Sequence, residues 1–176
     1  MTKRNKNKAN TNPNTNPNTN HWIKESAPWI FGFLFCLIGA FVCYLIYKQR
    51  KEYLKKHEPV LFDIKNKIEK MIPYFTEDEK YRLSRLKLQP DIKSYTIDKH
   101  DMHLCLENTD GNYYDENILI YVTIHELAHI FCDEIGHTEN YMNIFNNLLD
   151  IAERVGIYNP SINLPKEYCG VKIKNE

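Results

Sequence analysis

The residue types best able to do chemistry in this 176-residue chain are two histidines and a glutamate in one short segment. His125 and His129 are four residues apart, so on a helix both side chains project from the same face. Glu126 follows His125 directly and completes an H-E-x-x-H pattern. In zinc hydrolases, two such imidazoles bind the metal and the carboxylate acts as general base. We therefore expect His125 and His129 to bind Zn²⁺ and Glu126 to be the catalytic residue.

A catalytic zinc site also needs a third protein ligand and one open position. We predict His137, eight residues after His129, because Gly136 before it can end the helix and turn the chain back toward the metal. Glu139 is the main alternative for this ligand. Glu134 is a weaker one, since we expect it on the last turn of the helix. Cys132 could also approach the metal, although a buried apolar thiol is the commoner role.

Two helices are expected to position these ligands. Asp115 is a suitable N-cap for the first helix, whose apolar surroundings make unpartnered histidine and glutamate side chains costly to bury. Thr138 is a suitable N-cap for the second helix, and Gly156 closes it. Apolar residues at helical spacing in the second helix are core candidates: Tyr141, Ile144, Phe145, Leu148, Leu149, Ala152 and Val155. Tyrosine on such a face is usually core, so we assign none as an oxyanion-stabilising residue.

The region before the first of these helices predicts a small α+β domain. A basic helical stretch runs from about Lys48 to Ile72, and Pro73 ends it. Thr76 and Glu79 form a possible capping box for a helix to about Leu88. Residues 93–98 and 102–107 are predicted to be strands, and residues 109–112 a turn. We expect residues 102–107 to be an edge strand along which an extended peptide can lie.

Residues 29–47 form an uncharged apolar segment. As a helix with a rise of about 1.5 Å per residue, this segment reaches roughly 28 Å, close to the hydrocarbon core of about 30 Å. We predict a transmembrane helix that anchors the protein in a lipid bilayer. A cleaved signal peptide is one alternative, but the run is long and lacks a small-x-small exit. A buried core helix is another, but such a helix is rarely apolar on every face.

Charge is distributed unevenly around this segment. Residues 1–56 hold ten basic and two acidic residues, whereas residues 57–176 hold 13 basic and 21 acidic ones. Lys48, Arg50, Lys51, Lys55 and Lys56 follow the apolar segment, so the positive-inside rule places the C-terminal domain on the cytoplasmic side of the membrane. The acidic C-terminal part disfavours direct nucleic-acid binding.

Four domains follow from these patterns. Residues 1–28 are rich in Asn, Pro and Thr and are expected to be disordered, residues 29–47 are the transmembrane helix, residues 48–57 a basic juxtamembrane linker, and residues 58–176 the metallopeptidase domain. The five cysteines show no C-x-x-C and are predicted to remain unpaired, as in a reducing compartment.

With Tyr141 four residues after His137, the H-E-x-x-H pattern resembles the WLM and SprT-like zinc metallopeptidases. In particular, it is similar to WLM-like proteins of large DNA viruses, over roughly the C-terminal two-thirds of the chain. The segments that carry this wider resemblance are residues 92–99, 104–106, 114–117 and 167–170. The resemblance implies a zincin-like fold, Zn²⁺ as the cofactor, a protein or peptide substrate, and Glu126 as general base. The interval between His129 and His137 is longer than in typical cellular members.

Two functions fit the sequence. The first is a membrane-anchored zinc metallopeptidase. The second is a catalytically silent, membrane-bound interaction module that keeps zinc for structure alone. The presence of Glu126 favours the peptidase, because a structural zinc site needs no base and usually has a fourth protein ligand.

Overall fold

The computed structural model describes the backbone of residues 19–172 and the side chains of residues 29–171. It separates the chain into two units, Met1–Gln49 and Arg50–Glu176. In the described residues the chain is mixed α+β, with four α-helices, a small three-stranded sheet and a two-stranded hairpin. This confirms the predicted α+β class.

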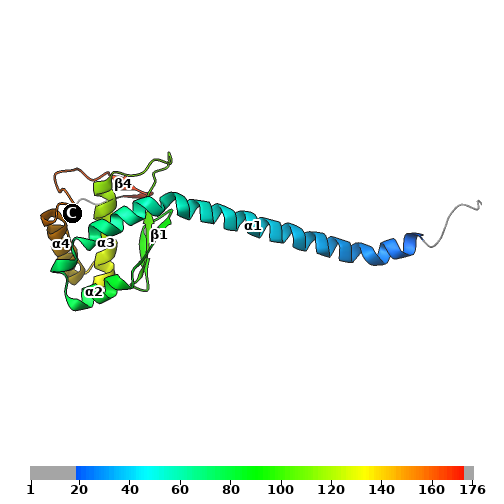
Figure 1. The fold of residues 1–176 in the computed structure, drawn as a ribbon, viewed down its shortest axis with the longest axis horizontal. Helices are drawn as coiled ribbons and strands as arrows, with labels where there is room; N and C mark the ends of the chain where they lie inside the picture. Colours follow the sequence, from blue (N-terminus) through cyan, green and yellow to red (C-terminus); the bar gives the residue numbers. More distant parts are fainter. Residues whose placement is uncertain (1–18, 173–176) are drawn as a thin grey trace, which may run out of the picture. The chain divides into compact units, whose positions relative to one another are not determined.

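The first helix, α1, runs without a break from Thr19 to Glu69 (Figure 1). All of its residues from 29 to 47 are exposed, and by length and composition this part is apolar enough to span a membrane. Residues 48–57, predicted to be a linker, are helical. Of the segment expected to be disordered, residues 19–28 belong to α1 and residues 1–18 lie outside the described part. After α1, the 3-10 helix η1 (Ile72–Tyr74) contains Pro73.

The second α-helix, α2, spans Glu77–Ser84 and begins with the predicted capping box. Thr76 Oγ1 accepts from the Glu79 backbone N–H, and the Thr76 N–H donates to the Glu79 carboxylate. The predicted extension to Leu88 is wrong, because strand β1 (Lys87–Asp91) begins there. Pro90 disfavours helical geometry at the residue before it, and pairing with a distant strand then favours the extended form.

The three-stranded sheet has the order β1-β3-β2. Strand β2 (Tyr95–Ile97) pairs antiparallel with β3 (Asp101–Cys105), whereas β1 pairs parallel with β3. Both predicted strands are therefore present in shorter form. The expectation that residues 102–107 form an edge strand is wrong, because β3 is central and β1 and β2 are the edges. No local pattern predicts β1, so β3 was expected to have one neighbouring strand, whereas it has two.

Helices α3 (Glu116–Phe131) and α4 (Glu139–Arg154) pack against each other, and α3 lies between α4 and the sheet (Figure 1). The predicted N-caps are confirmed: Asp115 accepts from the Asn117 N–H, and Thr138 accepts from the Tyr141 N–H. Gly156, with φ +72°, closes α4 as predicted. The α3 side chains Ile120, Ile124 and Leu127 are fully buried at the centre of the core.

The end of α3 differs from the prediction. The helix stops at Phe131, with Cys132 as its C-cap, so Glu134 lies in the following loop and not on the last helical turn. Gly136 therefore does not end the helix. With φ +86° it turns the loop that leads to α4, a conformation that glycine adopts without strain.

A disulfide joins Cys105 at the end of β3 to Cys169 in the C-terminal hairpin of β4 (Glu167–Tyr168) and β5 (Val171–Lys172). The prediction that all cysteines are unpaired is wrong for this pair. Their separation of 64 residues carries no pairing signal in a single sequence, whereas folding brings their Cα atoms to 6.4 Å. The disulfide also removes the argument for a reducing compartment. Cys36, Cys43 and Cys132 are free.

Candidate metal centre

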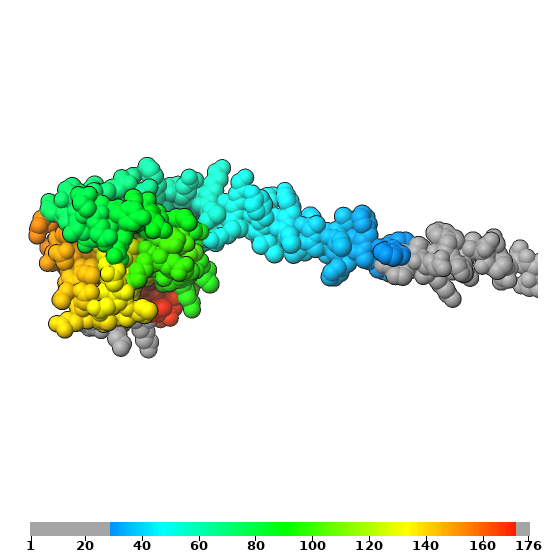
Figure 2. All heavy atoms as spheres, turned by 90° about the horizontal axis from the view of Figure 1, so that it is seen from below, coloured from blue at the N-terminus to red at the C-terminus, as the bar shows by residue number. Residues whose placement is uncertain are grey.

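Three imidazoles converge where α3 meets the loop of residues 132–138. His137 Nε2 lies 3.2 Å from His129 Nε2 and 3.2 Å from His125 Nε2. Tetrahedral zinc with Zn–N bonds of about 2.0–2.1 Å requires ligand nitrogens about 3.3–3.4 Å apart, so this arrangement fits one zinc ion. His125 and His129 are half-buried and His137 is exposed. The loop that carries His137 lies on the molecular surface, yellow in Figure 2.

The structure thus brings together the three histidines singled out in the sequence. Among the described residues, they are the one group of three or more His, Cys, Asp or Glu side chains close enough to hold a metal. Glu139, at the start of α4, and Glu134 are exposed and do not belong to this group. Cys132 is fully buried beside the group but accepts a weak hydrogen bond from Asn140 Nδ2.

The electrostatics of the site keep two of the imidazoles neutral. Burial, together with the neighbouring histidines, lowers the pKa of His125 to about 4. The pKa of His129 falls to about 4 for the same reasons, with a further contribution from Lys99. Neutral imidazole is the form that binds metal, so these ligands need not lose a proton at neutral pH.

Tyr141 forms a rigid support beneath all three histidines. It is 1% exposed, and its ring stacks on His129 at 4.4 Å and contacts His137 at 4.7 Å and His125 at 5.5 Å. Its hydroxyl donates to the backbone carbonyl of His125, 3.2 Å away. Through its ring contacts and this hydrogen bond, Tyr141 helps to hold the three histidines in place.

Glu126 is buried against the sheet, with 6% of its surface exposed. Burial raises the pKa of its carboxyl to about 7, and a hydrogen bond from Thr96 opposes the shift. The Thr96 hydroxyl donates to Glu126 Oε2 at 2.9 Å. Since Thr96 lies on β2, the edge strand fixes the orientation of this carboxylate. Thr96 is not recognisable from the sequence, because it is one of several residues in a predicted strand and lies 30 positions before Glu126.

Two cations hold the C-terminal end of α3 and the loop that carries His137. Arg82 Nη1 donates to the Ile130 carbonyl at 3.1 Å and to Asp133 Oδ1 at 2.8 Å. Lys99 Nζ donates to the carbonyls of His129 at 3.3 Å and of Cys132. Positive charge at a helix C-terminus satisfies carbonyls that have no intrahelical partner and complements the helix dipole. Neither residue is recognisable from the sequence, because both lie on other elements.

Two other histidines, His100 and His103, lie before and within β3 and do not belong to this cluster. His103 Nδ1 lies 3.1 Å from Asp91 Oδ2, and its ring stacks on Tyr95. His100 Nδ1 contacts the Asp98 carbonyl at 2.8 Å. The H-E-x-x-H spacing therefore distinguishes the histidines that converge from those that contact other residues.

The chain is similar to proteins of three viruses. It is 46% identical to the uncharacterized protein 136R of Invertebrate iridescent virus 6 over 90 residues, which are 49% of this chain and 51% of the relative. It is 43% identical to the uncharacterized protein 042R of Invertebrate iridescent virus 3 over 89 residues, which are 50% of this chain and 56% of the relative. The chain thus spans about half the length of these two relatives.

A longer match links the chain to the uncharacterized protein R325 of Acanthamoeba polyphaga mimivirus. The two are 33% identical over 159 residues, which are 87% of this chain and 74% of the relative. No protein-family model and no solved structure matches the chain.

Proposed function

We propose that this chain, which belongs to the same family as the mimivirus protein R325, is a membrane-anchored zinc metallopeptidase. The observation that carries the proposal is the convergence of three histidine Nε2 atoms beside a buried glutamate. Metal binding alone would explain the histidines. A catalytic role also explains why Glu126, next to a ligand residue, is buried and held by Thr96.

The arrangement of elements around the site supports a zincin-like fold, as the resemblance to WLM and SprT-like peptidases implies. Helix α3 presents two ligands from one face, and a loop supplies the third. Strand β2 lies beside α3 where Thr96 contacts Glu126. Among the described residues no fourth side chain joins the three histidines. One coordination position is then left open, as a catalytic zinc requires and a structural zinc does not.

Each residue has a distinct role in the proposed reaction. His125, His129 and His137 would hold the metal, which when bound supplies a Lewis acid that acidifies water and polarises a peptide carbonyl. Glu126 takes the proton from the attacking water and passes it to the leaving amine. Burial raises the pKa of this carboxyl to about 7 in the metal-free site, and a bound Zn²⁺ would lower it, so the carboxylate would be ready to accept the proton at neutral pH.

The protein or peptide substrate would lie along β2. This strand is a sheet edge, and Tyr95 and Ile97 are 37% and 45% exposed on it. The intervening Thr96 contacts Glu126. An extended peptide paired with β2 would therefore pass directly beside the proposed base. This assigns to β2 the role that the sequence analysis gave to residues 102–107.

The membrane orientation is a separate part of the proposal. The basic residues after the apolar segment favour a cytoplasmic-facing catalytic domain. The Cys105–Cys169 disulfide favours an oxidising compartment. We propose the cytoplasmic-facing orientation, since flanking charge acts directly on membrane insertion. Protease protection of sealed vesicles tests it, and a lumen-protected C-terminal domain would overturn the orientation without affecting the chemistry.

The direct test of the function is zinc content and peptide cleavage by the full chain in detergent. We expect about one zinc per chain and cleavage of some members of a broad peptide library, abolished by a chelator and restored by zinc. A chain that binds zinc fully and cleaves nothing would leave the interaction module as the better explanation.

A further inference from the structure

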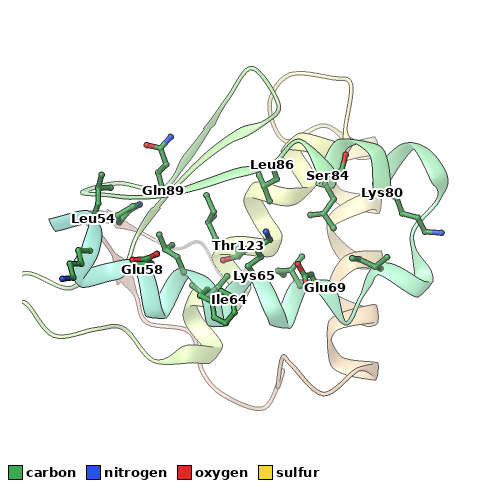
Figure 3. A pocket seen from close by; sticks show the side chains of 18 of the residues that line it. Leu54, Glu58, Ile64, Lys65, Glu69, Lys80, Ser84, Leu86, Gln89 and Thr123 are labelled. Atoms are coloured by element: carbon green, nitrogen blue, oxygen red, sulfur yellow. The ribbon is translucent and has the colours of Figure 1, made fainter. Parts of the chain in front are cut away.

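A groove that is separate from the candidate metal centre lies between α1, α2 and the free edge of β1. Its volume is about 920 Å³, near the upper end of the range of about 300–1,000 Å³ found for ligand sites. Figure 3 shows it extending from Leu54 and Gln89 at one end to Glu69 and Lys80 at the other. None of the metal-centre residues lines it.

The groove is lined mainly by alkyl side chains. They come from α1, from α2 and from the start of β1, and include Leu61, Ile64, Ile68, Leu83, Leu86 and Leu88. The hydroxyl of Thr123, in the floor of the groove, already donates to the Leu119 carbonyl at 2.7 Å. An apolar chain can therefore fill the interior without leaving a buried polar group unpaired.

The α1 side of the groove carries three lysines and two glutamates. Lys51, Lys55 and Lys65 line it, and none of the three takes part in an ion pair among the described residues. The acidic Glu58 and Glu69 lie on the same helix face. Lys51 and Lys55 follow the end of the apolar segment by only four and eight residues. Lysines this close to a membrane-spanning segment favour anionic lipid headgroups.

The free edge of β1 is poorly suited to an extended peptide. The Lys87 N–H donates to the His100 carbonyl at 2.8 Å, so the backbone polar groups of Lys87 point toward β3. These groups alternate in direction along a strand, so those of Leu88 and Pro90 point away from β3. Proline has no N–H, and an added strand would lack a donor at that position. The edge thus disfavours strand addition, while the alkyl lining remains available to a lipid.

We propose that this groove binds one acyl chain of an anionic phospholipid, with the lipid phosphate held by Lys51 and Lys55. The apolar lining, the unpaired lysines and the preceding apolar segment carry the proposal together. It rests on the membrane anchor of the proposed function but not on the metal centre, so peptide cleavage and lipid binding can each fail without the other.

Photo-crosslinking of the full chain in phospholipid vesicles tests the proposal. Phe62 lines the groove but is 65% exposed, so its replacement by the photoreactive analogue benzoylphenylalanine should leave the fold intact. The matched control carries the same group at Asn66, which is exposed on α1 but does not line the groove. The vesicles contain phosphatidylglycerol and phosphatidylcholine in equal amounts, and mass spectrometry identifies the adducts.

We expect a phosphatidylglycerol adduct at position 62, at least several-fold more abundant than at position 66. The double substitution Lys51→Glu and Lys55→Glu should reduce the preference for phosphatidylglycerol over phosphatidylcholine to near unity. Equal lipid labelling at the two positions, no lipid adduct, or adducts mainly to a second protein chain would overturn the proposal. An unchanged preference in the double variant would overturn the assignment of the phosphate to Lys51 and Lys55.

Discussion

Two clusters among the described residues are built around histidine, and they differ in what surrounds the imidazole. At the candidate metal centre, three Nε2 atoms face one another, with two of the rings half-buried. On α1, His57 is fully buried, and its ring meets the rings of Tyr53 at 4.4 Å and Tyr113 at 5.6 Å. Its Nδ1 lies 3.2 Å from the Tyr113 hydroxyl, while its Nε2 has no hydrogen-bond partner in the structure.

The comparison shows that burial of a histidine does not by itself make a site. His57 is more buried than any of the three candidate ligands, but aromatic rings face it instead of other ligand atoms. Glu107 Oε2, the nearest carboxylate oxygen, is 3.9 Å from its Nε2. The candidate metal centre differs because three histidine nitrogens converge and the buried carboxylate of Glu126 follows one of these histidines in the chain. The following predictions test whether chemistry is confined to that cluster.

The largest effect is expected for Glu126→Gln, which keeps the size of the side chain but removes the base. Turnover should fall by about 10²–10⁴-fold, the usual contribution of a general base, with zinc content unchanged. Peptide cleavage and metal analysis on the same preparation measure both quantities. His57→Phe is the matched control, and its turnover should stay close to that of the wild type. Equal turnover in Glu126→Gln and wild type would mean that Glu126 is not the base.

The third ligand gives the next largest effect. His137→Ala should weaken zinc binding by at least about 100-fold. Loss of a residue that only hydrogen-bonds a ligand already lowers metal affinity by about 10–100-fold, and loss of the ligand itself should cost more. Glu139→Ala should leave the affinity unchanged, because Glu139 lies outside the group of converging nitrogens. Competition with a chromogenic chelator measures both affinities. The opposite ranking of the two variants would assign the third ligand to Glu139.

How far the sequence predicts these features depends on the range of the interactions. Asp115, Thr138 and the Thr76–Glu79 box act within one helical turn, and the structure confirms all three caps. The three histidines were also recognisable, because they fall within 13 consecutive residues.

The features that the sequence did not reveal all involve distant partners. Strand β1 depends on parallel pairing with β3, the disulfide closes a separation of 64 residues, and Arg82 and Lys99 reach the end of α3 from other elements. No local pattern encodes such contacts, so a single sequence cannot reveal them. Thr96 belongs to this class, which is why its role needs its own test.

Thr96→Val removes the hydroxyl that donates to Glu126 and keeps the shape of the side chain. One hydrogen bond is worth about 1 kcal/mol, and more when the acceptor is charged, so turnover should fall by roughly tenfold. Thr96→Ser should restore most of the activity, because it returns the donor. KM should change little in either variant, as the hydroxyl contacts the base and not the peptide. Activity of the valine variant at the wild-type level would show that Thr96 does not position Glu126.

The smallest effect concerns His57 and the stability of the fold. Burial lowers the pKa of His57 below its usual value of 6.5, and Lys56 contributes in the same direction, whereas Glu107 opposes the shift. Below a pH of about 6.5 the unfolded chain therefore binds a proton that the folded chain does not bind, and the free energy of unfolding decreases as the pH falls. The contribution of one such group is at most about 1.4 kcal/mol per pH unit.

His57→Phe should keep the contacts with Tyr53 and remove this contribution, so that its free energy of unfolding falls less steeply as the pH decreases below about 6.5. Urea unfolding of the zinc-free full chain, followed by near-UV circular dichroism across this range, measures the slope. Tyr113→Phe is the control, because it removes the hydroxyl beside Nδ1 but leaves the imidazole buried, and its slope should remain that of the wild type. Identical slopes for His57→Phe and wild type would mean that the acid sensitivity of the fold arises elsewhere, the histidines of the metal centre being the next groups to test.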